Sequence, residues 1–295
     1  MTATAADDSQ GAGRAAARRR PAGDARGSRL SRLAWALSDA AVMTRRNLIH
    51  TVRVRELWPF IIIQPVLFVL LFAEVFGGAI ELPGGGNYRQ FLMAGVFAQA
   101  VAFTTYPTAV GVAWDMQLGL MDRFRTMPMH PSAMFIGRTF GDLGRMAISV
   151  TLMALCGLGV GWRINDGFAR AAGGFALLAL FGFSMSWVGA YFGLVAKSVQ
   201  AAQSQPMLWL FPVTFVSNAF VPTQHMPGVL ENVANWNPVS SVAAAIRMLF
   251  GNPHPFADPH SFPAQHAVLL TVLWSVGMTV AAAVLCTRRM RAVAR

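Results

Sequence analysis

A run of apolar residues from Leu57 to Phe76 follows directly after an arginine-rich amino-terminal segment, and Glu74 is its only charged residue. The hydrocarbon core of a bilayer is about 30 Å thick, so a helix that rises about 1.5 Å per residue crosses it with about 20 residues. The run is therefore long enough to span a membrane, and similar runs follow it. The sequence predicts an integral membrane protein whose function concerns something at or across the bilayer.

The composition agrees with a protein that has lipid as its solvent. The chain has 295 residues, of which 55% are hydrophobic and 13% are charged. Soluble domains carry about 25% charged residues, so this low charged fraction argues against a soluble globular class. Six candidate spans can be placed along the chain, at residues 57–76, 91–114, 146–162, 171–195, 206–222 and 266–286.

The positions of the basic residues predict the orientation of these spans. A net charge of +11 suggests nucleic-acid binding until the 24 Lys and Arg residues are located. If both termini lie inside the cell, all but four of them fall on the cytoplasmic side; the four are Arg89, Arg163, Arg170 and Arg247. This is the positive-inside asymmetry of membrane proteins. It predicts a multi-pass protein of the cell membrane with both termini cytoplasmic, and it explains the basic charge without a nucleic-acid partner.

Two segments precede the first span. Residues 1–28 consist mainly of small, polar and basic residues, which cannot bury a core, so they are expected to form a disordered basic tail. Residues 29–56 place leucines at helical spacing with arginines between them, which predicts an amphipathic helix in contact with membrane lipid. A short cytosolic helix packed on protein is the alternative. Residues 57–295 are expected to form one transmembrane domain.

Polar residues and glycines inside the spans favour a packed helical bundle. Thr104 and Thr105 lie at mid-depth in the second span, just before Pro107. Their hydroxyls are expected to bond to carbonyls that the proline leaves free, although they could also line a substrate path. Gly157 and Gly161 are four residues apart, as are Gly189 and Gly193, and such pairs allow helices to approach closely.

The remaining polar and aromatic positions have interfacial or packing explanations. Glu74 lies near the outer end of its span and has no evident basic partner, so it is expected to reach the interface rather than to act as a proton site. Trp162 is expected in the aromatic belt, and Trp187 and Trp274 between helices.

The stretch between the fifth and sixth spans predicts an external re-entrant hairpin. Residues 229–236 and 239–250 are two amphipathic pieces, each too short to cross a bilayer. Both are expected to enter the outer leaflet without crossing. The residues expected to define this hairpin are Pro227, Trp236, Asn237, Pro238 and Arg247.

The sequence contains no catalytic motif that we recognise. There is no Walker A phosphate loop, no HExxH and no GxSxG. His254, Asp258, His260 and His266 occur in one external loop, but their spacing fits no standard zinc site. We expect no catalytic, cofactor-binding or metal-binding residue, and we expect the cysteines, Cys156 and Cys286, to be buried thiols.

The cytosolic segment 115–145 carries a short apolar stripe with a charged rim. Leu118, Met121 and Phe124 recur every three residues, and acidic and basic residues surround them. Such a helix suits docking to a soluble partner, and a helix that lies on lipid is the alternative. The residues expected to dock are Leu118, Gly119, Met121, Asp122, Arg123, Phe124, Arg125 and Pro128.

The order of the motifs resembles ABC-2 type permeases, the membrane subunits of ABC exporters, and especially their daunorubicin-resistance-type branch. The cytosolic matches are Asp115, Gly119, Asp122-Arg123-Phe124-Arg125, Met127-Pro128, Gly137-Arg138 and Asp142-Leu143. The external matches are Phe220-Val221-Pro222-Thr223, Met226-Pro227, Asn237-Pro238-Val239 and Ala245-Ile246-Arg247. The resemblance covers about 240 residues, and the order and spacing of motifs that are each modest make it specific.

This resemblance implies an all-α membrane fold with six spans, an interfacial helix, a cytosolic coupling helix and the external hairpin. It implies two copies of a separate ATPase that binds ATP and Mg, no cofactor on this chain, and a second permease that is a copy or a relative. The expected function is the export of an amphipathic small molecule, such as a drug, a polyketide antibiotic or a lipid. An ion-coupled secondary transporter is the alternative, but Glu74 is the only candidate for its intramembrane charge. A membrane-embedded enzyme would need clustered acids or histidines at one depth.

Overall fold

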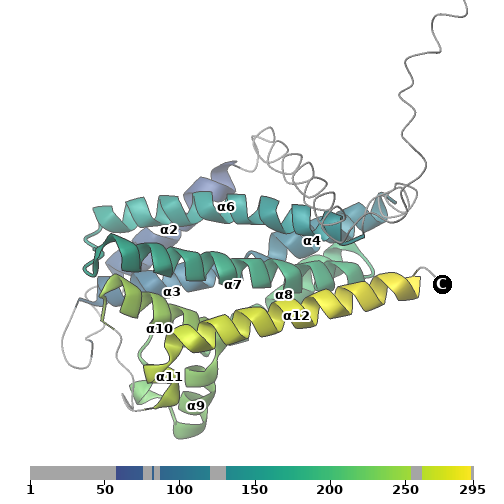
Figure 1. The fold of residues 1–295 in the computed structure, drawn as a ribbon. Coiled ribbons are helices and arrows are strands. Elements are labelled where there is room, and N and C mark those ends of the chain that lie inside the picture. Colours follow the sequence, from purple (N-terminus) through teal and green to yellow (C-terminus); the bar gives the residue numbers. More distant parts are fainter. Residues whose placement is uncertain (1–57, 76–81, 83–86, 120–130, 254–260, 294–295) are drawn as a thin grey trace, which may run out of the picture.

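The computed structural model describes residues 58–75, 82, 87–119, 131–253 and 261–293, and the regular secondary structure within these residues is helical (Figure 1). The predicted tail 1–28, the predicted interfacial helix 29–56 and the loop 120–130 lie outside the described residues. Six of the predicted docking residues therefore lie outside them too: Met121, Asp122, Arg123, Phe124, Arg125 and Pro128.

The described residues form the following helices in chain order. They are α2 (Trp58–Val75), α3 (Tyr88–Ala102), α4 (Thr105–Gln117), α6 (Pro131–Gly159), α7 (Gly167–Val195), α8 (Val199–Phe215), η2 (Thr223–His225), α9 (Gly228–Trp236), α10 (Pro238–Phe250), α11 (Phe262–Gln265) and α12 (Ala267–Val293).

Four helical segments of the described chain are long and apolar enough to cross a membrane. They are Tyr88–Gln117, Gly137–Gly159, Gly167–Val195 and Ala267–Met290. Each overlaps one of the six predicted spans. The other two predicted spans, 57–76 and 206–222, correspond to α2 and α8, which are helices of 18 and 17 residues and are not among these four.

The long helices form a bundle with α7 at its centre. Figure 1 shows α6, α7 and α12 running alongside one another, while α9 and α11 project from the bundle. Helix α7 packs most extensively against α12 and α4, and α10 lies against α3, α7 and α12. The last turns of α12 lie at the same end of the bundle as the end of α4 and the start of α6 (Figure 1).

The aromatic part of the core gathers around α3. Phe91 and Phe97 are fully buried, and the Phe97 ring makes edge-on contacts with Trp162 and Phe250, with ring centroids 5.4 and 6.4 Å away. Offset and edge-on aromatic pairs add to the free energy gained by burial. The core therefore ties α3 to the α6–α7 turn and to α10. Trp162 is buried and donates to Asn252, so its ring packs inside the bundle, and its depth at the membrane interface stays a prediction.

The second span is broken at Phe103 and Thr104, between α3 and α4. The Thr104 hydroxyl donates to the Val101 oxygen at 2.7 Å, and the Thr105 hydroxyl lies 2.9 Å from the Ala102 oxygen. The backbone also forms tighter, three-residue bonds here, including Thr104 N–H to the Val101 oxygen. The hydroxyls thus satisfy carbonyls at the interruption, as the structural explanation expected. The carbonyls differ from those expected, because Pro107 would free the Phe103 oxygen, which accepts from the Tyr106 N–H instead.

One of the two predicted glycine pairs brings helices together. A side-chain methyl at Gly189 would lie 2.4 Å from the Thr105 backbone oxygen, and one at Gly193 would lie 2.5 Å from the Ala109 oxygen. This pair therefore lets α7 approach the α4 backbone, as predicted. Gly161 behaves differently, because it has a positive φ of 97° and a methyl group added there would meet no described atom within 4 Å. It serves the turn after α6 rather than helix packing.

Other details differ from the sequence expectations. Trp187 is buried as expected, whereas Trp274 is 38% exposed on this chain because the outer face of α12 has no described neighbour. Glu74 does have a basic partner, since Arg89 lies 3.2 Å away, and both side chains are substantially exposed. Neither cysteine forms a disulfide; Cys286 is buried and Cys156 is partly buried.

Candidate coupling site and external hairpin

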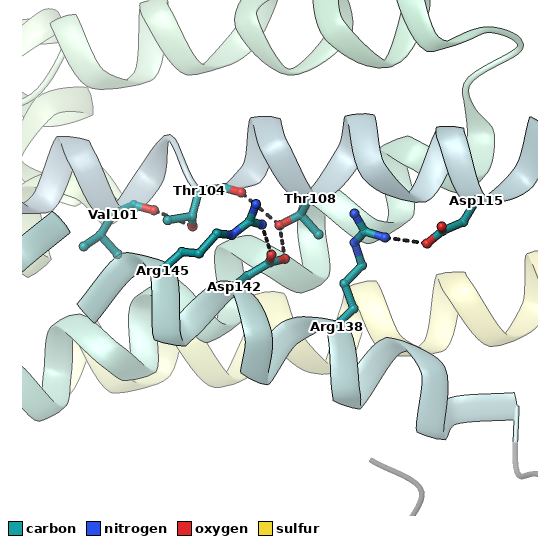
Figure 2. A network of polar contacts seen from close by, with 7 residues as sticks. All are labelled: Val101, Thr104, Thr108, Asp115, Arg138, Asp142 and Arg145. Atoms are coloured by element: carbon teal, nitrogen blue, oxygen red, sulfur yellow. Dashed lines mark hydrogen bonds and ion pairs between the residues drawn. The ribbon is translucent and has the colours of Figure 1, made fainter. Parts of the chain in front are cut away.

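An ion pair joins the two helices that flank the loop 120–130. Asp115 lies near the end of α4 and Arg138 near the start of α6, and Asp115 Oδ2 is 2.5 Å from Arg138 Nη1 (Figure 2). Their side chains are only 14% and 16% exposed. The structure thus brings together two residues of the predicted cytosolic motif across the loop that holds the predicted docking residues.

The backbone of α4 makes room for the arginine at Gly111. A methyl group at Gly111 would lie 1.4 Å from Arg138 Nη2. No side chain fits there while the guanidinium keeps its position, so glycine at this point of α4 lets Arg138 cross the helix surface and reach Asp115.

A second group of polar contacts lies deeper between the same helices. Asp142 is 5% exposed; it pairs with Arg145 of its own helix and accepts a hydrogen bond of 2.5 Å from the Thr108 hydroxyl of α4 (Figure 2). The Thr108 hydroxyl also lies 3.0 Å from the Thr104 backbone oxygen. Its one proton is therefore shared between this oxygen and the Asp142 carboxylate. We refer to these residues together as the α4–α6 polar network: Thr108, Asp115, Arg138, Asp142 and Arg145.

Direct packing between α4 and α6 is sparse. Helix α4 packs mainly against α7 and α8, whereas α6 packs mainly against α2 and α7. The α4–α6 polar network therefore supplies most of the specific contact between the two helices that enter and leave the loop.

The two predicted docking residues that the structure describes lie where α4 ends. Leu118 is 64% exposed, and Gly119 has a positive φ of 64°, a conformation that glycine adopts without strain. The Gly119 N–H bonds back to the Met116 oxygen at 3.1 Å. The helix therefore ends in a glycine turn with an exposed apolar residue beside it.

The network corrects two sequence predictions. Residues 131–145 are not a loop, because they form the first half of α6, and the segment long and apolar enough to cross a membrane begins at Gly137 and not at Met146. Their cytosolic placement stays a prediction. Asp142 and Arg145 thus lie within a candidate span. Glu74 is therefore not the only candidate for an intramembrane charge. The sequence did not predict that they lie within a span, because charged residues interrupt the apolar pattern by which a span is recognised.

The external motifs also meet, around the side chain of Arg247 in α10. This arginine is 1% exposed and donates through Nε to the Phe91 oxygen at 2.9 Å. Its Nη2 donates to the Asn218 and Ala219 oxygens at 2.9 and 3.1 Å, and its Nη1 to the Asn218 side chain at 3.1 Å. Arg247 thereby fixes α10 to α3 and to the turn after α8. The sequence analysis predicted Arg247 as a hairpin residue but missed its partner Asn218, because Asn218 belongs to no recognised motif.

Asn237 fixes the turn between the two hairpin helices. Its Oδ1 accepts from the Val239 N–H at 2.8 Å and caps α10, and its Nδ2 donates to the Val213 and Val216 oxygens, both at 2.7 Å. Pro238 follows as the first residue of α10, a position where a missing N–H is tolerated.

The other two predicted hairpin residues bound α9. Pro227 comes directly before the helix, and Trp236 ends it with its ring stacked on Phe262, the centroids 6.0 Å apart. The structure has two helices of 9 and 13 residues in this stretch, and their depth in the outer leaflet stays a prediction.

Comparison with known proteins decides the family. Residues 39–250 match the family described as ABC-2 type transporter. The chain belongs to the ABC-2 type transporter family. Both polar sites lie within the matched residues, and the predicted resemblance is confirmed.

Several curated relatives are similar over most of the chain. The daunorubicin resistance ABC transporter permease protein DrrB1 of Streptomyces coeruleorubidus is 35% identical over 67% of this chain and 70% of its own length. The doxorubicin resistance ABC transporter permease protein DrrB of Mycobacterium tuberculosis is 26% identical over 68% of this chain and 70% of its own length. Nodulation protein J of Rhizobium leguminosarum bv. trifolii is 25% identical over 77% of this chain and 85% of its own length.

Membership of the ABC-2 family assigns the general role of the chain. It is a multi-pass membrane subunit of an ABC exporter, of the drug-resistance type, in the plasma membrane. Permeases of this type work with an ABC ATPase partner and are not themselves the ATPase.

Proposed function

We propose that this chain is the permease of an exporter for amphipathic small molecules, and that the loop 120–130 docks on a separate ATPase chain. The observation that carries the docking proposal is the Asp115–Arg138 pair, which closes the base of this loop. A loop held at its base presents its apolar stripe in a defined position, which lowers the conformational entropy lost on binding. The exposed Leu118 at the end of α4 begins that stripe.

The proposed topology has six spans with both termini in the cytoplasm. Helices α2 and α8 supply the two spans beyond the four membrane-capable segments. Lys197 lies in the turn between α7 and α8, and Arg288 and Arg289 lie in the last turns of α12. Basic residues at these positions support a cytoplasmic face at this end of the bundle.

The proposed assembly contains two permeases and two ATPase chains, with ATP and Mg²⁺ bound by the ATPases. The second permease is a copy of this chain or a relative. Exposed apolar residues on α2, α8 and α12 support contact with lipid and with a second permease. The names of two relatives concern resistance to daunorubicin and doxorubicin. Together with the largely apolar bundle, they support an amphipathic drug, antibiotic or lipid as cargo.

Substitutions in the loop test the docking proposal. Phe124→Ala should remove an aromatic anchor, for which losses of at least about 2 kcal/mol are typical at an interface hot spot. Arg123→Glu should place an unmatched charge in the contact. Both variants should reach the membrane but lose co-purification with the ATPase and lose export. Phe168→Ala is a matched control, because Phe168 is 90% exposed in the first turn of α7, at the end of the bundle opposite to the end of α4 and the start of α6. Full export and full co-purification by both loop variants would show that this loop does not dock.

A secondary transporter is the second candidate because Asp142 is a buried carboxylate within a candidate span. Its contacts with Arg145 and Thr108 instead favour a structural role in joining helices. Removing the partner ATPase while keeping a transmembrane ion gradient separates the two. The exporter proposed here then stops, whereas an ion-coupled transporter continues.

A further inference from the structure

We propose that the α4–α6 polar network is a positioning element that makes α4 and α6 move together when the loop between them is displaced. Arg138 and Asp142 would thus pass movement of the docked ATPase into two parts of the bundle at once. This inference rests on the proposed function, because it requires that the loop be the place where the ATPase acts.

The packing of the bundle creates the need for such an element. Helix α4 belongs to one group of helices, with α7 and α8, while α6 also packs on α2, which touches neither α4 nor α8 extensively. Helix α7 packs on both α4 and α6, but without the polar side chains only the sparse α4–α6 packing would join these two helices directly. Charged and hydroxyl side chains bridge the helices instead.

Two separate contact points fix the helices better than one. Arg138, Asp142 and Arg145 follow one another at spacings of four and three residues, so they lie on one face of α6. On α4, Thr108 and Asp115 are seven residues apart, which is about two helical turns and the same face again. A single contact would let one helix pivot on the other. Contacts at two heights along both helices restrain sliding and rotation.

Burial makes the ion pair stiff. Asp115 and Arg138 are both largely shielded from water, where attraction between opposite charges is stronger than at an exposed surface. Separating them would leave two poorly hydrated charges without partners, which is unfavourable. The pair is therefore expected to persist while the loop moves, and to carry the displacement to both helices.

The test separates docking from transmission. Asp115→Asn and Arg138→Gln are made singly and together, and each is co-expressed with the ATPase in membrane vesicles. Three quantities are measured: co-purification of the two chains, ATP hydrolysis, and the amount of a fluorescent anthracycline exported per ATP hydrolysed. Because the pair also closes the base of the docking loop, we expect co-purification to weaken without disappearing. In the complex that still forms, hydrolysis should be retained and export per ATP should fall roughly tenfold, within the range of about 5- to 150-fold typical of coupling between sites.

The double variant shows whether the two residues act as a pair. If the ion pair carries the effect, the double variant should be no worse than either single one. Arg138→Lys keeps the charge but loses the planar fork, so it should restore part of the export, and it replaces Arg138→Gln if that variant fails to reach the membrane. Asp142→Asn should also lower export per ATP, because it weakens the second contact point.

A matched control breaks an ion pair that is not in the network. Arg170→Gln removes the exposed Arg170–Asp166 contact within α7, and it should leave export per ATP unchanged. Unchanged export per ATP in the Asp115 and Arg138 variants would overturn the inference, and so would effects that simply add in the double variant. Complete loss of co-purification in these variants would also overturn it, since the network would then serve docking alone. Failure of the docking proposal is seen separately, as retained co-purification in Phe124→Ala.

Discussion

Arg247 in α10 and Phe91 in α3 are 156 residues apart in sequence, yet the arginine donates to the Phe91 backbone oxygen at 2.9 Å and its guanidinium carbon lies 3.7 Å from the centre of the Phe91 ring. One side chain thus combines a hydrogen bond and a cation–π contact with the same residue. Its other acceptors, on Asn218 and Ala219, are neutral as well. A fully buried cation is held here by oxygens and a ring, which ties the hairpin to the second span.

Replacing Arg247 should destabilise the protein markedly. Arg247→Ala leaves several buried oxygens without donors, at about 1–3 kcal/mol for each group left unsatisfied. Arg247→Lys should also lower the unfolding temperature, because a lysine cannot reproduce the forked geometry. Thermal unfolding in detergent, followed by size-exclusion chromatography, measures both. An Arg247→Ala variant that unfolds at the wild-type temperature would contradict this account of the junction.

Gly189→Ala should weaken the packing of α7 on α4. The added methyl group would lie 2.4 Å from the Thr105 oxygen, so the helices must separate, and overpacking of this kind costs about 1–3 kcal/mol. Gly173→Ala in the same helix is the control, because a methyl group added there would lie 3.9 Å from the Leu249 side chain, an ordinary contact distance. A lower unfolding temperature for the first variant only is the expected result. Equal behaviour of the two would contradict close α4–α7 packing.

Trp162→Phe should lower stability through one lost hydrogen bond. The indole N–H donates to the Asn252 side-chain oxygen at 2.8 Å, and both residues are buried. Phenylalanine keeps most of the apolar contact with Phe97 and Phe250 but leaves that oxygen without this donor, at a cost of about 1–3 kcal/mol. Trp236→Phe is the control, since Trp236 is half-exposed. Chemical or thermal unfolding compares the two, and a larger loss at Trp236 would count against the expectation.

Cysteine labelling should reveal the orientation of the chain. Cys156 and Cys286 are first replaced by alanine, and single cysteines are then placed at Gly85, Pro259 or Lys197. A membrane-impermeant maleimide added to intact cells should modify the first two and spare Lys197→Cys, whose position is exposed in the α7–α8 turn. Labelling of Lys197→Cys from outside would contradict the proposed six-span topology with cytoplasmic termini.

The sequence predicts the apolar helices well because their signal is local. Twenty consecutive apolar residues favour a span wherever they occur, and glycine pairs such as Gly189 and Gly193 mark close packing within one helix. The start of α6 was harder to predict. Arg138, Asp142 and Arg145 read as solvent-exposed charges until their partners are known, and those partners, Asp115 and Thr108, lie on another helix.

The burial of Trp162 and Arg247 was hidden for the same reason. A tryptophan at the end of a span usually lies at the interface, and an arginine in a short external helix usually faces water. Both are buried here because distant residues satisfy their N–H groups, Asn252 for the indole and Asn218 with two backbone segments for the guanidinium. A local sequence pattern cannot predict a hydrogen-bond acceptor that belongs to another helix or turn.

The interruption at Phe103 and Thr104 gives the second span a particular mechanical character. Before it in the chain, α3 is tied to α10 through Phe91. After it, α4 is tied to α6 through Asp115 and Thr108. The span is held at both ends and bends most easily at one point between them. Continuous four-residue hydrogen bonding gives a helix its stiffness, and this bonding is altered at the interruption. An applied load therefore changes the angle between two straight segments instead of curving the whole helix.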